Sequence, residues 1–230
     1  MIISLAKSEV FSFSEEIFII KKTMLNNGFI ESGYDSRDII LDETFEKTAN
    51  IPLKYDFTEF QKIKAMDQGK EYKCVPYSLS LIINSRKKLD GISYELNIDE
   101  IYDNRTNEGD GMMIRDALKY MKSVGFCSKD SSDREKILSY GRLNSKNAIK
   151  ASVYMNGPCI MALPVYDSTR IDFWNGYEFE GGHAIACVGY NEDGFILMNS
   201  WGKGFGYSGR CILPYDEMNK LLECWTFLLK

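Results

Sequence analysis

The hydrophobic pattern of the chain changes at Gly157-Pro158, and this change constrains the fold more than any other feature. Before it, apolar residues recur at helical spacing, for example at Ile114, Ala117, Leu118 and Met121. After it, they fall in short runs separated by turn residues, which is typical of strands. Helices followed by strands predict an α+β fold, because a parallel α/β sheet needs the two kinds of element to alternate.

Helices are predicted over residues 76–89 and 113–124. The first has Pro76 in its opening turn and three basic residues at its end, so its start lies at or beside Cys74. Strands are predicted over residues 160–165, 184–190, 195–198, 210–213 and 225–229. The sequence Asn191-Glu192-Asp193-Gly194 is expected to join two of these strands as a hairpin.

Residues 1–50 are predicted to form an N-terminal extension, and Ile51-Pro52 marks its boundary with a domain over residues 51–230. The extension contains a possible short strand at 17–20 and a turn-rich stretch over 26–38. It also carries apolar aromatic residues at Phe11, Phe13 and Phe18. Packing into a core is the simplest interpretation of these rings, while covering a cleft or contacting a partner stays open.

Composition excludes several classes of function. The net charge is -5, from 28 Lys and Arg against 33 Asp and Glu, and no dense basic run is present, so nucleic acid is not an expected partner. No apolar stretch approaches the roughly 20 residues that a membrane-spanning helix needs. The first 22 residues do not resemble a secretory signal, which predicts a cytoplasmic protein and leaves unconventional export open.

The cysteines are interpreted as thiols in a reducing compartment. Of the six, four lie in apolar, strand-like runs and are expected to be small buried hydrophobic residues: Cys159, Cys187, Cys211 and Cys224. With one histidine in the whole chain and no paired cysteine motif, the usual zinc ligand sets cannot be assembled. No metal and no organic cofactor are therefore expected.

Two residues are candidates for chemistry. Cys74 lies at a predicted helix start, where unpaired backbone N–H groups and the helix dipole favour a thiolate, although a single cysteine is more often a buried core residue. His183 is the sole histidine and opens a predicted strand after two glycines that permit close approach. The hairpin is expected to bring Asn199 near His183, with a register that the sequence leaves open.

Four motifs occur in one order along the chain. They are Asp67-Gln68-Gly69 before Cys74, Gly157-Pro158 before a strand, Gly181-Gly182-His183-Ala184 with Val188-Gly189-Tyr190, and Asn199-Ser200-Trp201-Gly202. In this order and spacing they resemble the papain-like cysteine peptidases, from about residue 51 to the C-terminus. The resemblance implies a two-lobed fold, with a helical lobe, an antiparallel β-barrel-like lobe and an active site in the cleft between them.

The resemblance extends to the prokaryotic branch of the family. It is carried by Gly28-Phe29-Ile30, Asp35-Ser36-Arg37-Asp38, Tyr55-Asp56-Phe57, Arg115-Asp116-Ala117 and Leu213-Pro214-Tyr215-Asp216. By this similarity residues 28–50 are expected to pack on the catalytic domain and need not be a removable segment.

The family mechanism implies a role for each matching residue. Cys74 would attack a peptide carbonyl, His183 would transfer protons, and Asn199 would hold the imidazole. The Gln68 amide and the Cys74 backbone N–H would stabilise the oxyanion. Substrate contacts are expected at Gly111, Met112, Gly182 and Trp201. Trp201 would also shield the contact between His183 and Asn199 from solvent.

The sequence departs from the family pattern at Glu71-Tyr72-Lys73, where a small, glycine-containing turn is usual, and at Phe205, where a second tryptophan is common. Bulky side chains would narrow the oxyanion loop, and the opposite charges of Glu71 and Lys73 would roughly cancel at the thiolate. The predicted function is a cysteine endopeptidase acting on peptides or proteins, with a protein inhibitor as a further partner. The alternatives are an inactive peptide-binding protein and a thiol acyltransferase or amidase that uses the same residues.

Overall fold

The computed structural model of the protein describes residues 28–47, 50–58 and 63–229. The predicted strand at 17–20 and the phenylalanines at 11, 13 and 18 lie outside these residues. Among the helices that are described, none is long and apolar enough to cross a membrane.

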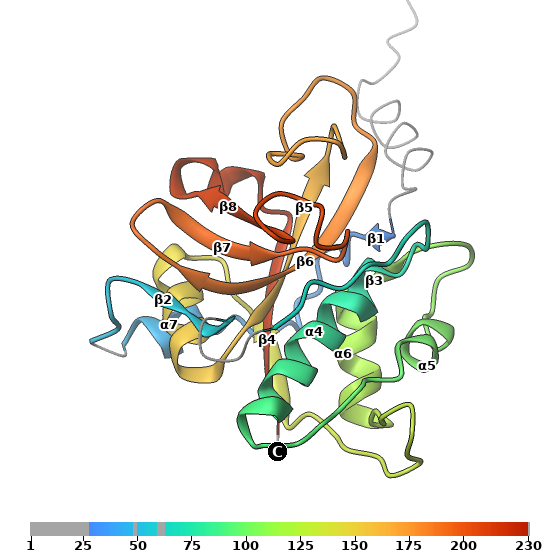
Figure 1. Ribbon diagram of the computed structural model, residues 1–230. Coiled ribbons are helices and arrows are strands. Elements are labelled where there is room, and N and C mark those ends of the chain that lie inside the picture. The colour runs from blue at the N-terminus through green and yellow to red at the C-terminus, as the bar shows by residue number, and fades with distance from the viewer. Residues whose placement is uncertain (1–27, 48–49, 59–62, 230) are drawn as a thin grey trace, which may run out of the picture.

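The described helices are α2 (Asp42–Glu46), α4 (Cys74–Leu89), α5 (Ile98–Asp103), α6 (Ile114–Ser123), α7 (Lys146–Asn156) and a 3-10 helix, η1 (Tyr215–Lys220). The strands are β1 (Phe29–Ile30), β2 (Tyr55–Asp56), β3 (Met112–Met113), β4 (Ser139–Arg142), β5 (Cys159–Val165), β6 (Gly181–Tyr190), β7 (Gly194–Met198), β8 (Arg210–Pro214) and β9 (Glu223–Leu228). Figure 1 shows their arrangement.

Both predicted helices and all five predicted strands are confirmed, with ends that move by one to three residues. The hairpin is also confirmed, because the Asn191 N–H donates to the Gly194 carbonyl between β6 and β7. Helix α7 was not predicted, although Ser145 caps its first turn by accepting from the Ala148 N–H and Gly157 follows its last residue. These are ordinary start and stop signals, and they were available in the sequence.

Strand β6 is the centre of the sheet. It pairs with β1, β2, β5 and β7, and the longest path through the sheet runs β3-β1-β6-β5-β9-β4. The pairings are antiparallel except for β1 with β3, which run parallel. The sheet is open, so the predicted β lobe resembles part of a barrel and is not a closed one. All ten residues of β6 are buried, which explains why its sequence does not alternate between apolar and polar residues.

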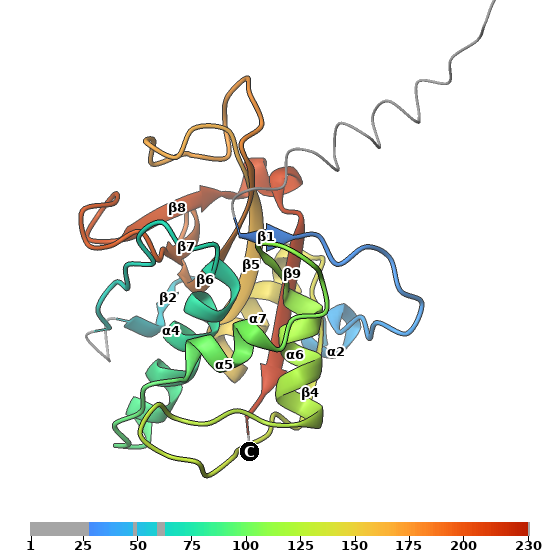
Figure 2. The same ribbon diagram turned by 90° about the vertical axis from the view of Figure 1, so that its right-hand side faces the viewer.

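Two hydrophobic cores form because successive residues of β5 and β6 point to opposite faces. Ile160 and Ala162 of β5 join Ala184 and Ala186 of β6 in a core with α4, α5 and α6. The residues between them join a second core with α7, β7 and β8. Figures 1 and 2 show α4, α5 and α6 on one side of these strands and α7 on the other. The small alanines let α4 lie close to β6.

Arg86 fixes the C-terminal half of α4 to the second half of the chain. Its guanidinium is buried and donates to the carbonyls of Pro158, at 2.7 Å, and Phe227, at 2.9 Å. Gly157 has a φ of 83°, and a Cβ there would lie 3.0 Å from the Arg86 Nε. Burial lowers the Arg86 pKa to about 10, and the two peptide carbonyls stabilise its buried cation.

The segment after β1 is held by a buried group of charges. Ser32 donates its backbone N–H and its hydroxyl to the carboxylate of Glu223. Asp38 accepts from the Nε of Arg115, at 2.9 Å, and from the Nε of Arg142, at 2.8 Å. Strand β1 therefore belongs to the same sheet as the strands that follow residue 51, while the predicted domain boundary at Ile51 stays a prediction.

We expect Arg86→Met to lower the free energy of unfolding by about 2–4 kcal/mol. The variant keeps most of the side-chain volume but removes the Arg86 donors from the carbonyls of Pro158 and Phe227, of which Phe227 keeps the donor from Asn156. Urea denaturation followed by tryptophan fluorescence measures this loss.

Lys88→Met is the matched control, because Lys88 lies exposed near the end of the same helix. Its effect should stay within about 0.5 kcal/mol. Equal stabilities for the two variants would contradict the anchoring role of Arg86.

Candidate active site

Cys74 is the first residue of α4 and is completely buried. The helix start lies here because Pro76 suits a first turn, where its missing N–H costs no hydrogen bond. The Sγ of Cys74 accepts from the Ala184 N–H at 3.3 Å. In return, the Ser78 hydroxyl one turn along α4 donates to the Ala184 carbonyl at 2.9 Å. These two bonds fix the first turn of α4 to β6 at the residue after His183.

His183 and Asn199 form a direct hydrogen bond. The His183 Nε2 lies 2.7 Å from the Asn199 Oδ1, and both side chains are buried. The β6–β7 hairpin produces this contact. Ala186 of β6 pairs with Met198, the last residue of β7, so Asn199 continues along β6 toward His183. The Asn199 Oδ1 also accepts from the Ser200 N–H, at 2.7 Å, which fixes the orientation of the amide.

Gln68 is held beside this hairpin by three hydrogen bonds. Its backbone N–H donates to the Ser200 carbonyl at 2.8 Å, and its Oε1 accepts from the Ser200 hydroxyl at 2.6 Å. Its Nε2 donates to the Glu71 carbonyl at 2.7 Å. An amide nitrogen carries two protons, so the second proton of Nε2 is available for another acceptor.

Two aromatic side chains surround the imidazole. The Trp201 ring lies 4.4 Å from the His183 ring and is tilted by 34°. The Phe173 ring lies 5.7 Å from it and is nearly perpendicular, at 85°. Sequence reasoning identified Trp201 but missed Phe173, which belongs to the loop between β5 and β6 and has no motif around it.

Burial dominates the electrostatics of the site. It raises the pKa of Cys74 to about 12, against the opposing effect of the backbone N–H groups of Ala184, Val75 and Cys74 itself. It lowers the pKa of His183 to about 4, against the opposing effect of the hydrogen bond that the His183 Nε2–H donates to Asn199. The expectation of a thiolate at the helix start is therefore wrong for this conformation, because desolvation of the buried sulfur outweighs the helix N-terminus.

The loop before Cys74 does not close over the site. Tyr72 is partly exposed, and about half of the Glu71 side chain is exposed. Lys73 donates to Glu71 at 3.2 Å and to Asp99 at 2.8 Å, so the charges of Glu71 and Lys73 are paired with each other and with Asp99. The expected cancellation of their effects at the Cys74 thiolate stays a prediction.

The segment of β1 lies against three of the four residues that were expected to contact substrate, which are Gly111, Met112 and Gly182. Phe29 pairs with Met112 on one side and with Gly182 on the other. The Gly28 carbonyl accepts from the Met112 N–H at 3.0 Å. Gly111 and Gly182 are buried as well, and a Cβ on Gly182 would lie 2.5 Å from the Phe29 ring.

Gly28 reaches the sulfur of Cys74. A Cβ built on Gly28 would lie 3.1 Å from the Cys74 Sγ and 2.9 Å from the Tyr72 carbonyl carbon. The φ of Gly28 is 88°, a conformation that favours glycine. The backbone of this segment therefore occupies the space next to the thiol.

The comparison with protein families gives one match, to the papain family cysteine protease domain over residues 82–221. The matched region is more than half of the chain and contains His183 and Asn199. The chain belongs to the papain family. The predicted family, the α+β fold class and the cysteine peptidase activity are confirmed. Cys74 and Gln68 precede the matched region.

Relatives of the papain family support the same fold. Xylellain, a cysteine protease from Xylella fastidiosa, superposes with a TM-score of 0.75 at 23% identity, over 90% of this chain and 97% of its own. Procathepsin B from Trypanosoma congolense gives 0.72 at 16% identity, over 92% and 88%. A peptidase C1-like protein of Acanthamoeba polyphaga mimivirus is 24% identical over 75% of this chain and 74% of its own length. The prokaryotic branch of the papain family stays a prediction.

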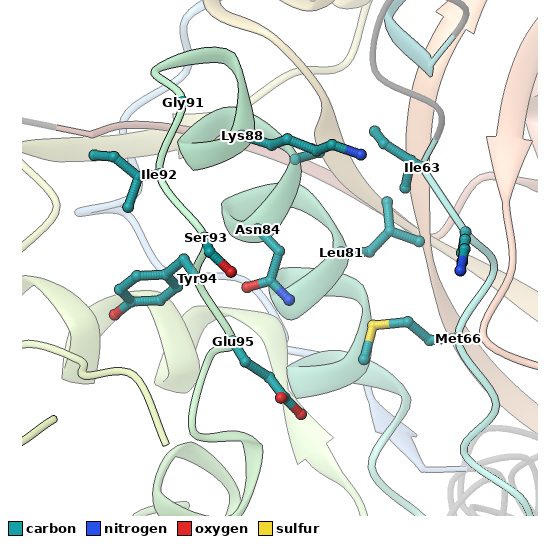
Figure 3. A pocket seen from close by; sticks show the side chains of 12 residues that line it. Ile63, Met66, Leu81, Asn84, Lys88, Gly91, Ile92, Ser93, Tyr94 and Glu95 are labelled. Carbon is teal, nitrogen blue, oxygen red and sulfur yellow. The ribbon is translucent and has the colours of Figure 1, made fainter. Parts of the chain in front are cut away.

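Two pockets lie near α4. One, of about 230 Å³, reaches His183 and Trp201 and is bordered by residues 69–72 and Ser168. The other, of about 780 Å³, lies between α4 and residues 91–95 and contains none of the predicted site residues (Figure 3).

Over the described residues, no group of three or more His, Cys, Asp or Glu side chains is placed to hold a metal ion. All six cysteines are buried, and Cys159, Cys187, Cys211 and Cys224 are free thiols, which confirms the interpretation of these four.

We expect the free energy of unfolding to fall by about 2 kcal/mol between pH 7 and pH 5 because of His183. Its pKa is about 4 in the folded protein and 6.5 in a free side chain, so the unfolded chain takes up the proton first as the pH falls. The stability present above pH 6.5 is therefore lost toward pH 4. Urea titrations at the two pH values measure the loss.

His183→Gln is the control, because glutamine keeps a polar side chain near Asn199 and does not titrate. The variant should lose about 2 kcal/mol less than the natural protein over this pH range. An identical loss in both proteins would assign the pH dependence to other groups.

Proposed function

We propose that the protein is a cysteine endopeptidase in which Cys74 is the nucleophile and His183 the general acid and base. The observation that supports this most directly is the hydrogen bond between the Ala184 N–H and the Cys74 Sγ, because it places the sulfur at the residue adjacent to His183. Asn199 would orient the imidazole through its Nε2, which leaves Nδ1 to exchange protons with the sulfur.

The reaction proceeds in two steps. The Cys74 thiolate attacks the carbonyl carbon of a peptide and forms a C–S bond, while the His183 imidazolium gives its proton to the amide nitrogen and the C–N bond breaks. The amine leaves and a thioester remains. Neutral His183 then takes a proton from water, the water oxygen attacks the thioester, and the C–S bond breaks to release the acid and restore the ion pair.

Gln68 and the Cys74 backbone N–H would stabilise the negative oxygen in both steps. Ser200 and Glu71 already orient the Gln68 amide, so the amide need not turn when negative charge develops on the carbonyl oxygen of the substrate. Preorganised donors of this kind are worth more than donors that must reorient, because they pay no reorganisation at the moment of reaction.

A substrate can reach Cys74 only after Gly28–Ile30 leaves the cleft, since the Gly28 backbone lies against the sulfur. We name residues 28–38 the strap and infer that it keeps the peptidase latent. The structural relatives include procathepsin B and the proform of a ragweed pollen cysteine protease. Departure of the strap would also admit water to the buried thiol and imidazole, which favours their ion pair.

The strap is held at its far end by charges that do not touch the sulfur. Arg115 donates to the carbonyls of Ser32 and Gly33, and Arg142 donates to the Gly33 carbonyl at 3.0 Å. Both arginines share Asp38, whose side chain is 9% exposed. Loss of the Asp38 charge leaves two partly buried guanidinium groups with fewer acceptors and weakens the attachment of the strap.

The active-site assignment is tested by intact mass after incubation with E-64, the inhibitor bound to a Carica candamarcensis relative. We expect one adduct on the natural protein and none on Cys74→Ala, because an epoxide of this kind needs an activated thiolate. His183→Ala should retain the sulfur but hydrolyse peptides about 10²–10⁴-fold more slowly.

An adduct of equal yield on Cys74→Ala would place the reactive thiol elsewhere and overturn the assignment. A different result would favour an inactive peptide-binding protein. In that case E-64 does not modify the natural protein, and the variants that loosen the strap, described below, also fail to hydrolyse peptides.

We expect Asp38→Asn to react with E-64 about 10-fold faster than the natural protein, because a loosened strap uncovers Cys74 for a larger fraction of the time. Asp35→Asn is the matched control, since it makes the same change in charge on the same segment but pairs with Arg37, which is exposed. The rate of adduct formation is followed by mass spectrometry.

Gly28→Ala tests the contact itself. Its methyl group meets the Tyr72 carbonyl and the Cys74 sulfur, whereas Gly33→Ala introduces a similar backbone strain with no atom within 4 Å. Gly28→Ala should therefore speed labelling and Gly33→Ala should not. If the natural protein is labelled as fast as Asp38→Asn and Gly28→Ala, the strap does not keep the peptidase latent. The assignment of Cys74 as nucleophile would stand.

A further inference from the structure

The imidazole of His183 has one hydrogen-bonded atom and two aromatic neighbours. The bond from Nε2 to Asn199 fixes the position of one nitrogen, but the ring can still turn about the line that joins the two atoms. Trp201 lies over the ring at 4.4 Å and limits its motion in one direction. Phe173 stands nearly perpendicular to the ring and supplies a second boundary.

Phe173 is itself held firmly. It is completely buried, and its carbonyl accepts from the Tyr166 N–H at 2.8 Å. The next residue, Trp174, donates its indole N–H to Glu217, and Asn175 donates to the same carboxylate at 3.0 Å. These bonds tie the loop to η1, so the Phe173 ring is a fixed surface and not a mobile side chain.

Phe173 also contacts the residue that stacks on His183. Its ring lies 5.0 Å from the Trp201 ring and crosses it at 61°. The same ring therefore limits His183 directly and supports the tryptophan that covers it. Edge-to-face contacts of this kind contribute about 0.5–1.5 kcal/mol each beyond the area they bury.

We propose that Phe173 is a positioning residue for His183, which fixes the plane of the imidazole so that Nδ1 faces the sulfur of Cys74. The expected effect of Phe173 on peptide hydrolysis rests on the proposed function. Its effect on the orientation of the imidazole does not. Loss of the aromatic edge lets the imidazole tilt and admits water beside it.

Several titratable or charged groups lie on the elements around His183. They are Cys74 at the start of α4, Asp67, Lys70, Glu71 and Tyr72 in the loop before it, Asp167 and Asp172 in the loop of Phe173, and Lys203 after Trp201. Burial is the main cause that keeps the His183 pKa low, at about 4. Variants at Phe173 leave all of these groups in place, so a change in the histidine pKa reports a change in its solvation.

The control variant comes from the same aromatic cluster. Phe205 contacts Trp201 at 5.2 Å and Phe173 at 6.2 Å, while none of the ring contacts within the described residues joins Phe205 to His183. Phe173→Leu and Phe205→Leu therefore remove the same ring from one cluster, but only the first removes a neighbour of the imidazole.

The experiment uses the full-length protein and the NMR signals of its sole histidine, which need no assignment. In Phe173→Leu we expect the histidine pKa to rise from about 4 toward 6.5, because water reaches the ring. In Phe205→Leu it should stay near the natural value. Phe173→Tyr keeps the aromatic edge and should restore it.

Peptide hydrolysis supplies the second measurement. Phe173→Leu should lower kcat by about 10- to 100-fold, with KM changed less than about 2-fold, because misplacement affects proton transfer and not binding. Equal histidine pKa values in Phe173→Leu and Phe205→Leu would overturn the positioning role. Turnover is therefore measured with the strap loosened by Asp38→Asn in every variant. Absence of turnover in all of them, with the pKa shifted as expected, would overturn the proposed function and leave the positioning of the ring standing.

Discussion

The pair of hydrogen bonds between the first turn of α4 and Ala184 is the constraint on which the site depends. Ala184 donates its N–H to the sulfur of Cys74, and its carbonyl accepts from the hydroxyl of Ser78, so one residue of β6 is fixed to the helix at two points. His183 is the residue before Ala184 on β6, so its backbone lies next to this attachment of the helix. The alanines of β5 and β6 allow this approach because larger side chains would keep α4 away from the sheet.

The same close packing explains the electrostatic state of the site. A sulfur at a helix start gains from backbone N–H groups, but complete burial raises the pKa of Cys74 to about 12 and lowers that of His183 to about 4. Both groups are therefore neutral near pH 7 in this conformation. The backbone of Gly28 contributes to that burial because it lies against the sulfur. The segment that covers the cleft therefore also excludes water from Cys74 and His183, and this loss of water disfavours their ion pair.

Local patterns predicted much of the molecule. The spacing of Ile114, Ala117, Leu118 and Met121 gave the buried face of α6, and all four are fully buried. The start of α4 at Cys74 followed from Pro76 and the basic end of the helix. The capping signals of α7 were present and were missed. The pairing of β1 with β3 and β6 could not be found, because strands of two residues carry no periodicity and their partners lie far along the chain.

The sequence by itself determined the α+β class, the helix at Cys74, the hairpin that joins His183 to Asn199 and the family resemblance, because these depend on residues that are near in sequence or on fixed motifs. Only the tertiary structure decided the solvation of Cys74, the approach of Gly28 to its sulfur, the charges that hold the strap and the place of Phe173 beside the imidazole. These properties are set by contacts between distant segments, and burial of a charge or ring depends on everything that surrounds it.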